Sequence, residues 1–259
     1  MPEAQELFGA LRAISLDAMN ERAALQRRID QKYLVAIDDV AQLLDEVADD
    51  LEVLEIDGER VFDYESTYFD TPSLRCFRDH VRDDRPRYKA RTRCYLDTDD
   101  CYFEVKVKLG DGEMVKRNVE HASDERDRLD DPAHELVDET LDDCGLGDPG
   151  GELKPSLITR FKRVTVVARD APERTTFDFE VSLNTPEGDT AELDERYVIA
   201  ETKTEDGNGA WDRAFADRGR EPVSLSKYRV GIGLLQAPGE DRDYAGDLKQ
   251  LFKVRAASR

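Results

Sequence analysis

The chain has 259 residues, and its 59 acidic and 38 basic side chains give a formal net charge of −21 at pH 7. Proteins that coat nucleic acids are normally basic, so we expect no nucleic-acid partner. No apolar run approaches the roughly 20 residues that a membrane-spanning helix needs, and no segment is typical of a signal peptide. The sequence therefore predicts a cytoplasmic protein without a transmembrane segment.

The four cysteines, Cys76, Cys94, Cys101 and Cys144, are scattered along the chain. They show neither a CxxC pair nor the Cys/His spacing of a zinc site. In a chain of this length, such cysteines are typical of reduced thiols and not of a disulfide framework. We therefore expect four thiols.

Helical and strand periodicities alternate along the chain. Residues 38–51 are typical of an amphipathic helix, with Asp38 as its N-cap and an apolar stripe that includes Val40, Leu43 and Leu44. Turn signals separate many of the strands at hairpin length, which favours antiparallel pairing. In chain order, the expected elements are a helix at 3–23, a strand at 26–35, a helix at 38–51, strands at 53–56 and 61–69, a helix at 73–82, strands at 86–96, 101–109 and 113–120, a helix at 132–144, strands at 157–169, 174–184 and 196–203, and a helix at 209–218.

A sheet of about eight or nine strands usually curls or closes on itself. We therefore predict an α+β fold, a closed and mainly antiparallel β-barrel with helices packed outside, where they cover apolar strand faces. The expected organisation is an N-terminal helix at 1–24, one domain at 25–237 and a C-terminal tail at 238–259.

Charged side chains gather on one face of several expected strands, because side chains alternate across a strand with a period of two. In 86–96, Arg91 and Arg93 share one face, whereas Ala90, Thr92 and Cys94 share the other. The bases on such faces are Arg28, Lys32, Arg87, Lys89, Arg91, Arg93, Lys106, Lys108, Arg163, Arg174 and Lys203. The acids on them are Asp30, Glu104, Asp178, Glu180 and Glu201.

A solvated outer face would explain one such strand. The charge balance argues against that interpretation for the whole set, because eleven bases and five acids give +6 and leave −27 for the rest of the chain. Crowded bases repel one another unless interleaved acids or a bound polyanion relieve the repulsion. Bases for phosphate oxygens, together with carboxylates for a hard cation such as Mg²⁺ or Mn²⁺, are typical of phosphoryl transfer.

Nine short segments that occur in order over about residues 27–235 point to a family. They are Arg28-Ile-Asp-Gln-Lys-Tyr33, Glu65-Ser-Thr-Tyr-Phe-Asp-Thr71, Arg87-Tyr-Lys-Ala-Arg-Thr-Arg-Cys-Tyr95, Phe103-Glu-Val-Lys-Val-Lys108, Lys116-Arg117, Arg160-Phe-Lys-Arg163, Arg174-Thr-Thr-Phe-Asp178, Ala200-Glu-Thr-Lys203 and Ser224-Leu-Ser-Lys-Tyr228. In this order they resemble the VTC (vacuolar transporter chaperone) domain, the polyphosphate polymerase branch of the triphosphate tunnel metalloenzymes.

The resemblance implies a basic tunnel that holds a triphosphate, and metal-dependent transfer of the γ-phosphate of ATP to a growing inorganic polyphosphate chain. Carried over by motif, the catalytic phosphate ligands are Lys32, Arg91, Arg93, Lys106, Arg163 and Arg174. The further substrate-binding residues are Ser226 and Lys227 by motif, and Arg28, Lys89, Lys108 and Lys203 by their strand faces. Glu201 matches the ligand of Mn²⁺ or Mg²⁺, and the other candidate metal ligands are Glu104, Asp178 and Glu180.

The opening motif departs from that of sister branches. The adenylate cyclase and thiamine-triphosphatase group begins with Glu-x-Glu-x-Lys, whereas this chain has Arg28-x-Asp30-x-Lys32, which favours the VTC branch. Eukaryotic relatives add a regulatory domain and membrane helices that this sequence lacks. We therefore assign no transport of the product and leave a membrane-protein partner open.

Several alternatives stay open on the sequence alone. The same bases would serve a metal-dependent hydrolase of inorganic triphosphate or of nucleoside triphosphates, and also a non-catalytic polyanion-binding subunit. Tyr68 and Asp70 are equally compatible with a place in the tunnel and with a turn. Gly231 and Gly233 lack the rest of a dinucleotide fingerprint, so we expect them to serve local packing.

Overall fold

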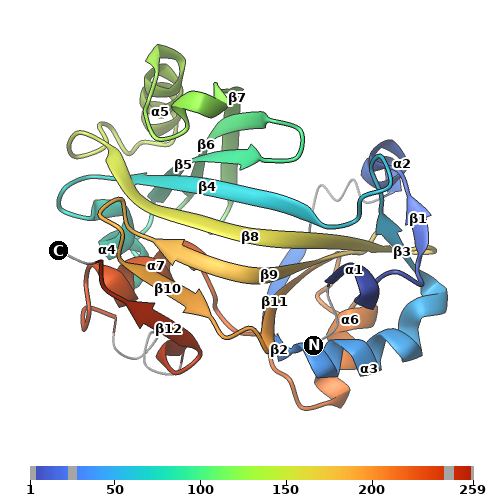
Figure 1. Ribbon diagram of the computed structural model, residues 1–259. Helices are drawn as coiled ribbons and strands as arrows, with labels where there is room; N and C mark the ends of the chain where they lie inside the picture. The colour runs from blue at the N-terminus through green and yellow to red at the C-terminus, as the bar shows by residue number, and fades with distance from the viewer. Residues whose placement is uncertain (1–3, 23–27, 242–247, 258–259) are drawn as a thin grey trace. The chain divides into compact units, whose positions relative to one another are not determined.

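The computed structural model describes residues 4–22, 28–241 and 248–257. The fold is α+β, with mainly antiparallel strand pairing and helices (Figure 1). The chain divides into two compact units. Unit 1 comprises Met1–Phe62, Phe161–Val181 and Leu193–Leu225, and unit 2 comprises Asp63–Arg160, Ser182–Glu192 and Ser226–Arg259.

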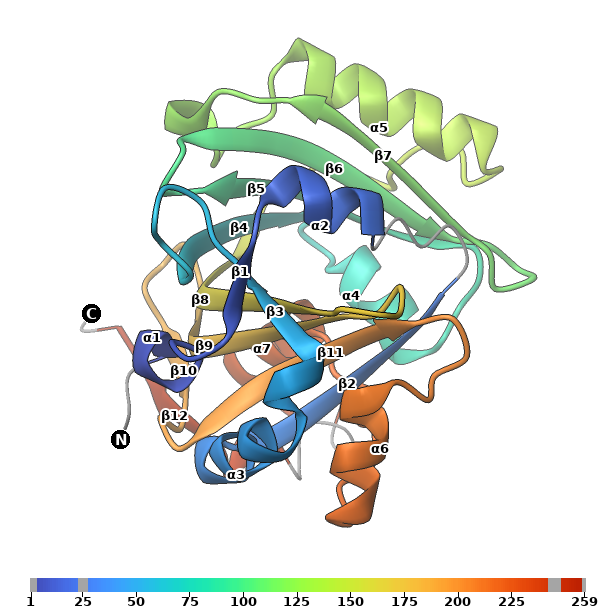
Figure 2. The same cartoon turned by 90° about the vertical axis from the view of Figure 1, so that its right-hand side faces the viewer.

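Unit 1 is built around strand β11, which pairs antiparallel with β2 on one side and with β9 on the other. Strand β3 pairs antiparallel with β8 and parallel with β1. Helix α3 lies against β2 (Figure 2). The elements that contribute to this unit are α1 (Ala4–Leu7), β1 (Arg12–Ile14), α2 (Leu16–Arg22), β2 (Ile29–Ala36), α3 (Ile37–Val47), a 3₁₀ turn (Ala48–Asp50), β3 (Leu51–Leu54), β8 (Lys154–Ala168), β9 (Arg174–Asn184), β11 (Tyr197–Thr204) and α6 (Ala210–Asp217).

Unit 2 contains an antiparallel meander of the strands β4, β5, β6 and β7. Helix α5 packs against β6 and β7, and α4 packs against β5 and α7 (Figure 1). The first residues of β8 and the last residues of β9 also belong to this unit. Its other elements are β4 (Phe62–Asp70), α4 (Arg75–Val81), β5 (Arg87–Tyr95), β6 (Asp100–Lys108), β7 (Met114–Glu120), a 3₁₀ turn (Ser123–Glu125), α5 (Asp131–Asp143), β10 (Thr190–Leu193), α7 (Lys227–Leu235) and β12 (Phe252–Arg255).

The core of unit 1 confirms the predicted apolar stripe of α3. Val40, Leu43 and Leu44 are buried in one cluster together with side chains from β2, β3, β9 and β11. Trp211 and Phe215 of α6 lie in the same cluster, with their ring centroids 5.5 Å apart. This cluster covers the apolar side of the strands whose other side carries charges. The predicted N-cap at Asp38 is wrong, because α3 begins at Ile37 and its N-cap is Ala36.

All nine predicted strands are confirmed, and each lies within a few residues of its expected bounds. The single helix predicted at 3–23 is wrong in its middle, because residues Arg12–Ile14 form β1 and pair in parallel with β3. Pairing with a distant strand outweighs the local helical pattern there. Residues 3 and 23 of that prediction, and residues 26 and 27 of the strand predicted at 26–35, lie outside the described residues. Closure of the sheet into a barrel and the domain boundaries at 24 and 237 stay predictions.

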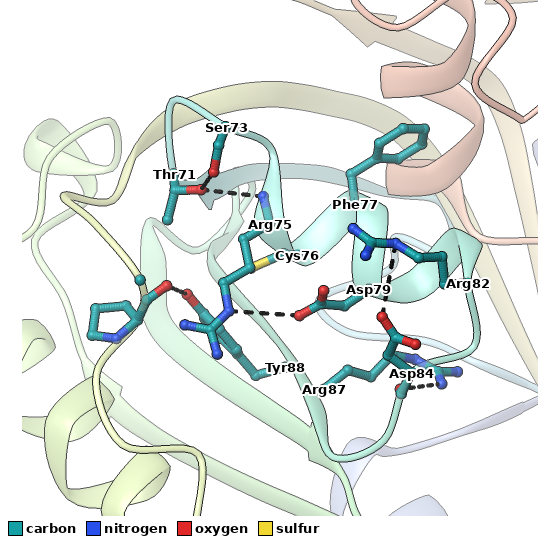
Figure 3. A network of polar contacts seen from close by, with 12 residues as sticks. Thr71, Ser73, Arg75, Cys76, Phe77, Asp79, Arg82, Asp84, Arg87 and Tyr88 are labelled. Atoms are coloured by element: carbon teal, nitrogen blue, oxygen red, sulfur yellow. Dashed lines mark hydrogen bonds and ion pairs between the residues drawn. The ribbon is translucent and has the colours of Figure 1, made fainter.

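Asp70 has a structural role at the start of α4. Its carboxylate accepts hydrogen bonds from the backbone N–H groups of Cys76 and Phe77, at 2.9 and 3.1 Å. It also accepts a hydrogen bond from the Tyr228 hydroxyl. The Thr71 hydroxyl accepts the N–H of Arg75 at 3.1 Å (Figure 3). These contacts satisfy backbone donors that a helix start leaves without intrahelical partners. Asp70, the last residue of β4, therefore anchors the start of α4.

Two of the four cysteines form a disulfide, so the prediction of four thiols is wrong for them. Cys94 of β5 and Cys101 of β6 face each other in the strand register and are joined by a disulfide bond. Cys76 and Cys144 are free thiols. The sequence spacing alone did not reveal the pair, because the register that aligns the two residues is a property of the folded hairpin.

Helix α7 was not predicted from the sequence, because its Gly-x-Gly stretch weakens the helical pattern. Gly231 lies where α7 meets β8, and a Cβ atom at this position would lie 2.5 and 2.7 Å from the two Cδ atoms of the buried Leu157. The absence of a side chain permits this close approach. The expected packing role of Gly231 is thereby confirmed. Among the described residues, no helix is both long and apolar enough to cross a membrane.

The Gly231→Ala variant is expected to lower the free energy of unfolding by about 1–2 kcal/mol, because overpacking against Leu157 outweighs the better helix propensity of alanine. Urea denaturation measures this change. Gly110→Ala is the matched control, because a Cβ at Gly110 meets no atom within 4 Å. Equal stability of the two variants would show that α7 can shift away from β8 without cost.

Candidate functional site

In unit 1, the charged side chains predicted to share a face do so on four neighbouring strands. The register places Lys32 of β2 opposite Glu201 of β11, and Lys203 of β11 opposite Arg174 of β9. Arg163 of β8 lies beside them and binds Asp178 of β9. Strand alternation holds all of these side chains on one side, because their apolar neighbours are buried in the core on the other.

Glu201 lies between two lysines. Its Oε1 is 2.9 Å from Nζ of Lys32, and its Oε2 is 2.9 Å from Nζ of Lys203. Burial alone would raise the pKa of Glu201, but the charges of Lys203, Lys32 and Arg163 hold it well below its usual range. Burial lowers the pKa of Lys203, and the Glu201 charge offsets part of this effect. The carboxylate is therefore ionised at neutral pH.

The remaining bases of unit 1 are held by different partners. Arg163 makes a bidentate pair with the buried Asp178, with Nε–Oδ1 and Nη2–Oδ2 distances of 2.6 and 2.9 Å. The pKa of Arg174 is lowered by burial and by the nearby charges of Arg28 and Arg163. Arg28 binds Asp30 at 2.8 Å on the exposed start of β2. The charged face of β2, β8, β9 and β11 therefore carries several basic side chains close together.

Glu180 does not join this face, although the strand alternation predicted it there. Its backbone has a φ of 50°, so the regular alternation of β9 is interrupted at this residue. Its exposed carboxylate binds Lys162 at 3.0 Å, and Lys162 points to the opposite side of β8 from its neighbour Arg163. The predicted alternation holds only for a regular strand. The interruption at Glu180 places its side chain on the other side of β9.

In unit 2, the meander β4–β7 brings a second set of bases onto one face. The register aligns Arg91 with Glu104, Lys89 with Lys106, and Arg87 with Lys108. On the neighbouring strands, Lys106 is opposite Lys116, and Arg91 is opposite Tyr68. These residues alternate with the buried Tyr88, Ala90, Phe103, Val105 and Val107. The basic face predicted for β5 and β6 is therefore confirmed as a shared face.

Glu104 is the carboxylate at the centre of this face. Its Oε2 accepts from Arg91 Nε at 2.8 Å and lies 3.9 Å from Arg93 Nε, while its Oε1 lies 2.6 Å from Lys116 Nζ. Burial raises the pKa of Glu104, but Arg91 and Lys116 lower it below its usual value. Arg91 also donates to the Tyr68 hydroxyl at 2.9 Å. Burial lowers the pKa of Arg91, whereas Tyr68 and Glu104 raise it further, so the guanidinium stays charged.

The start of α7 adds a polar edge to unit 2. Ser226 is the N-cap of α7 and accepts from Arg229 N–H at 3.4 Å, and Lys89 Nζ lies 3.1 Å from its hydroxyl oxygen. Lys227 is the first residue of the helix. The Lys89 ammonium also lies 5.9 Å from the ring centroid of Tyr228. The cap therefore connects α7 to the charged side of β5.

Two residues of the unit 2 face were missed as site residues. Lys116 was noted within a motif, and its alternation with the inward-facing Val115 was the signal that could have placed it beside Lys106. The sequence of Tyr68 and its neighbours is equally compatible with a place in the tunnel and with a turn. Its hydroxyl contact to Arg91 and its stacking on Tyr228, with centroids 5.0 Å apart, place it on the face.

The described residues contain no group of three or more His, Cys, Asp or Glu side chains arranged to hold a metal ion. Mg²⁺ is usually bound by one or two carboxylates together with substrate phosphates and water, so a full protein cage is not required. Glu201 fits that role by its chemistry, because it is ionised and mostly buried. Asp178 and Glu104 share much of this chemistry, because each is buried and, like Glu201, paired with basic side chains.

Comparison with known families gives a match over most of the chain. The family model of the VTC domain matches residues 27–236. The chain belongs to the VTC domain family. The resemblance seen in the nine sequence motifs is thereby confirmed. No curated protein is similar enough in sequence to match this VTC domain.

Solved structures of low sequence identity are similar to this VTC domain. The candidate adenylyl cyclase HpAC1 from Hippeastrum, described as having a dominant triphosphatase activity, is 17% identical, with 82% of this chain and 99% of that chain covered and a TM-score of 0.47. A candidate adenylate cyclase from Bacillus halodurans is 14% identical, with coverages of 77% and 94% and a TM-score of 0.47. Another from Vibrio parahaemolyticus is 13% identical, with coverages of 77% and 95% and a TM-score of 0.42. At these TM-scores the likeness supports no statement about function.

The Glu104→Gln variant is expected to lower the free energy of unfolding by about 3 kcal/mol at pH 7, because it leaves Arg91, Arg93 and Lys116 without their shared buried carboxylate. The pKa of Glu104 is lower in the folded chain than the value of about 4.3 in an unfolded one, so its contribution is present above that value. The contribution is lost as the pH falls through the folded pKa. The difference between wild type and variant should therefore shrink below about pH 4.

Urea denaturation from pH 3 to pH 7 measures this difference. Glu139→Gln is the matched control, because Glu139 is exposed on α5. A wild-type-to-variant difference that stays constant with pH would contradict the electrostatic role of Glu104.

Proposed function

We propose that this protein binds the triphosphate of ATP on its basic strand faces and transfers the γ-phosphate to a growing inorganic polyphosphate chain. The family match supports this proposal, and so does the charge arrangement. The proposed phosphate ligands are Lys32, Lys203, Arg163, Arg174 and Arg28 in unit 1, and Arg91, Arg93, Lys106, Lys89, Lys108, Ser226 and Lys227 in unit 2. Closure of the sheet around a tunnel belongs to the same proposal.

The observation that carries the proposal is the charge of these faces within an acidic chain. The net charge of the chain is −21, yet on the unit 2 face the buried carboxylate of Glu104 is surrounded by Arg91, Arg93 and Lys116. A polyanion relieves the repulsion that remains between these bases. Arginine forks bind phosphate oxygens with short and often bidentate hydrogen bonds. The excess of bases is thus of the kind that phosphate recognition needs.

The proposed reaction uses no nucleophile from the protein. An oxygen of the terminal phosphate of an acceptor chain attacks the γ-phosphorus of ATP in line, the bond between the γ-phosphorus and the β–γ bridging oxygen breaks, and ADP leaves. The arginines and lysines neutralise the charge that spreads over the phosphate oxygens. Glu201 would hold a Mn²⁺ or Mg²⁺ ion, which supplies further charge stabilisation when it is bound. In this proposal, Lys32 and Lys203 keep Glu201 ionised and oriented.

Incubation with ATP and Mn²⁺, followed by separation of the products on a gel, tests the proposed reaction. Long polyphosphate chains are expected. Orthophosphate and ADP without long chains would identify a hydrolase, in which water replaces the acceptor phosphate. No turnover, together with tight binding of triphosphate, would identify a non-catalytic subunit.

The Arg91→Lys variant is expected to weaken the binding of inorganic triphosphate at least tenfold, because lysine lacks the planar fork that binds two phosphate oxygens. Calorimetric titration at two salt concentrations measures this effect. Moderate salt should weaken wild-type binding only slightly, since enclosed contacts are screened less than exposed ones. Arg117→Lys is the matched control, because Arg117 lies on the opposite side of β7 and binds Asp143. Equal affinity of wild type and Arg91→Lys, with a steep loss in salt, would indicate an exposed patch.

The Glu201→Gln variant is expected to reduce turnover at least tenfold at saturating Mn²⁺, because it removes a charge-stabilising group while preserving the side-chain volume. Initial rates of phosphate transfer from ATP give this number, and an unchanged far-ultraviolet dichroism spectrum shows that the fold is intact. Near-normal turnover of the variant would indicate that Glu104 or Asp178, and not Glu201, is the metal ligand.

A further inference from the structure

Three tyrosines lie at one end of the basic face of unit 2. Tyr64 of β4 is directly opposite Tyr95 of β5, and Tyr102 of β6 is directly opposite Arg93. The ring centroids of Tyr64 and Tyr95 are 5.0 Å apart, and those of Tyr95 and Tyr102 are 6.4 Å apart. All three residues are half-buried, so each is partly accessible to solvent. We call these three residues the tyrosine cluster.

The tyrosine cluster continues the row of phosphate ligands along β5. Arg91, Arg93 and Tyr95 follow one another on the same face, because they are two residues apart. At about 3.3 Å per residue, Tyr95 lies roughly 7 Å along the strand from Arg93 and roughly 13 Å from Arg91. This spacing is on the scale of a nucleotide that extends from its phosphates through a ribose to a base.

The charge of the face changes sign at the tyrosine cluster. The strand register places Asp100 opposite Tyr95, and Glu120 opposite Tyr102, and both carboxylates are exposed. Carboxylates repel phosphate oxygens, so a polyphosphate chain would be disfavoured at this end of the face. They accept hydrogen bonds from amino groups such as those on the edges of nucleobases. Accessible aromatic rings bind nucleobases by stacking, and a phosphate chain offers nothing to stack on them.

Cross-strand packing alone would account for one aromatic pair. It does not account for the order of side chains along the face, in which arginines and lysines are followed by aromatic rings flanked by carboxylates. We propose that the tyrosine cluster binds the base of a nucleoside triphosphate whose phosphates lie along Arg93 and Arg91. This inference rests on the phosphate-binding role proposed above, and it makes a nucleoside triphosphate, not inorganic triphosphate, the preferred ligand of the unit 2 face.

Calorimetric titration without divalent metal compares ATP with inorganic triphosphate in wild type, Tyr95→Leu and Tyr95→Phe. Tyr95→Leu is expected to weaken ATP binding about tenfold, because it removes a stacking ring. Its affinity for inorganic triphosphate should stay within about twofold of wild type, since no phosphate ligand changes. Tyr95→Phe keeps the ring and should retain ATP binding. Tyr197→Leu is the matched control, because it removes a half-buried tyrosine of unit 1.

Tyr102→Leu provides a second test if Tyr95→Leu folds poorly, and the same selective loss of ATP binding is expected. Equal loss of both ligands, or loss of neither, would overturn the base-binding role while leaving phosphate binding in place. A wild type that binds inorganic triphosphate but not ATP would also overturn it. A wild type that binds neither ligand would overturn the proposed function, and this inference with it.

Discussion

The repulsion between like charges on a strand face is the constraint on which the site depends. Alternation forces Arg91 and Arg93 onto the same side of β5, and the register adds bases from β6 and β7. At separations of a few ångströms and away from bulk water, such charges interact strongly. In each unit, a carboxylate lies among the basic side chains and reduces this repulsion. Glu104 does this in unit 2, and Glu201 does it in unit 1.

These carboxylates reduce the repulsion but do not neutralise it. Glu104 carries one negative charge among Arg91, Arg93 and Lys116, and Glu201 carries one between Lys32 and Lys203. The bases are therefore held in defined positions and keep an excess of positive charge. Phosphate oxygens meet side chains that are already oriented, which lowers the entropic cost of binding. The acidic remainder of the chain repels anions at long range, so we expect affinity to come from short contacts within the face.

The rigidity of the charged faces comes from the apolar sides of the same strands. Every second residue of β5 and β6 is buried, and the cluster of unit 1 joins β2, β9 and β11 to α3 and α6. Helix α7 approaches β8 closely because Gly231 has no side chain, and this helix carries Ser226 at its N-cap. A packed core thus fixes the backbone from which the charged side chains project.

The sequence by itself determined the strands, the two-sided pattern of β5 and β6, and the family. These follow from local periodicity and from residue order, which can be recognised in the sequence without knowing which distant residues are in contact. Only the tertiary structure decided which residues meet. Pairing between β1 and β3 replaced a predicted helix, and the hairpin register joined Cys94 to Cys101. A single backbone break turned Glu180 away from Asp178. Strand registers and bulges depend on how segments that are distant in the chain pack together, so local sequence patterns do not predict them.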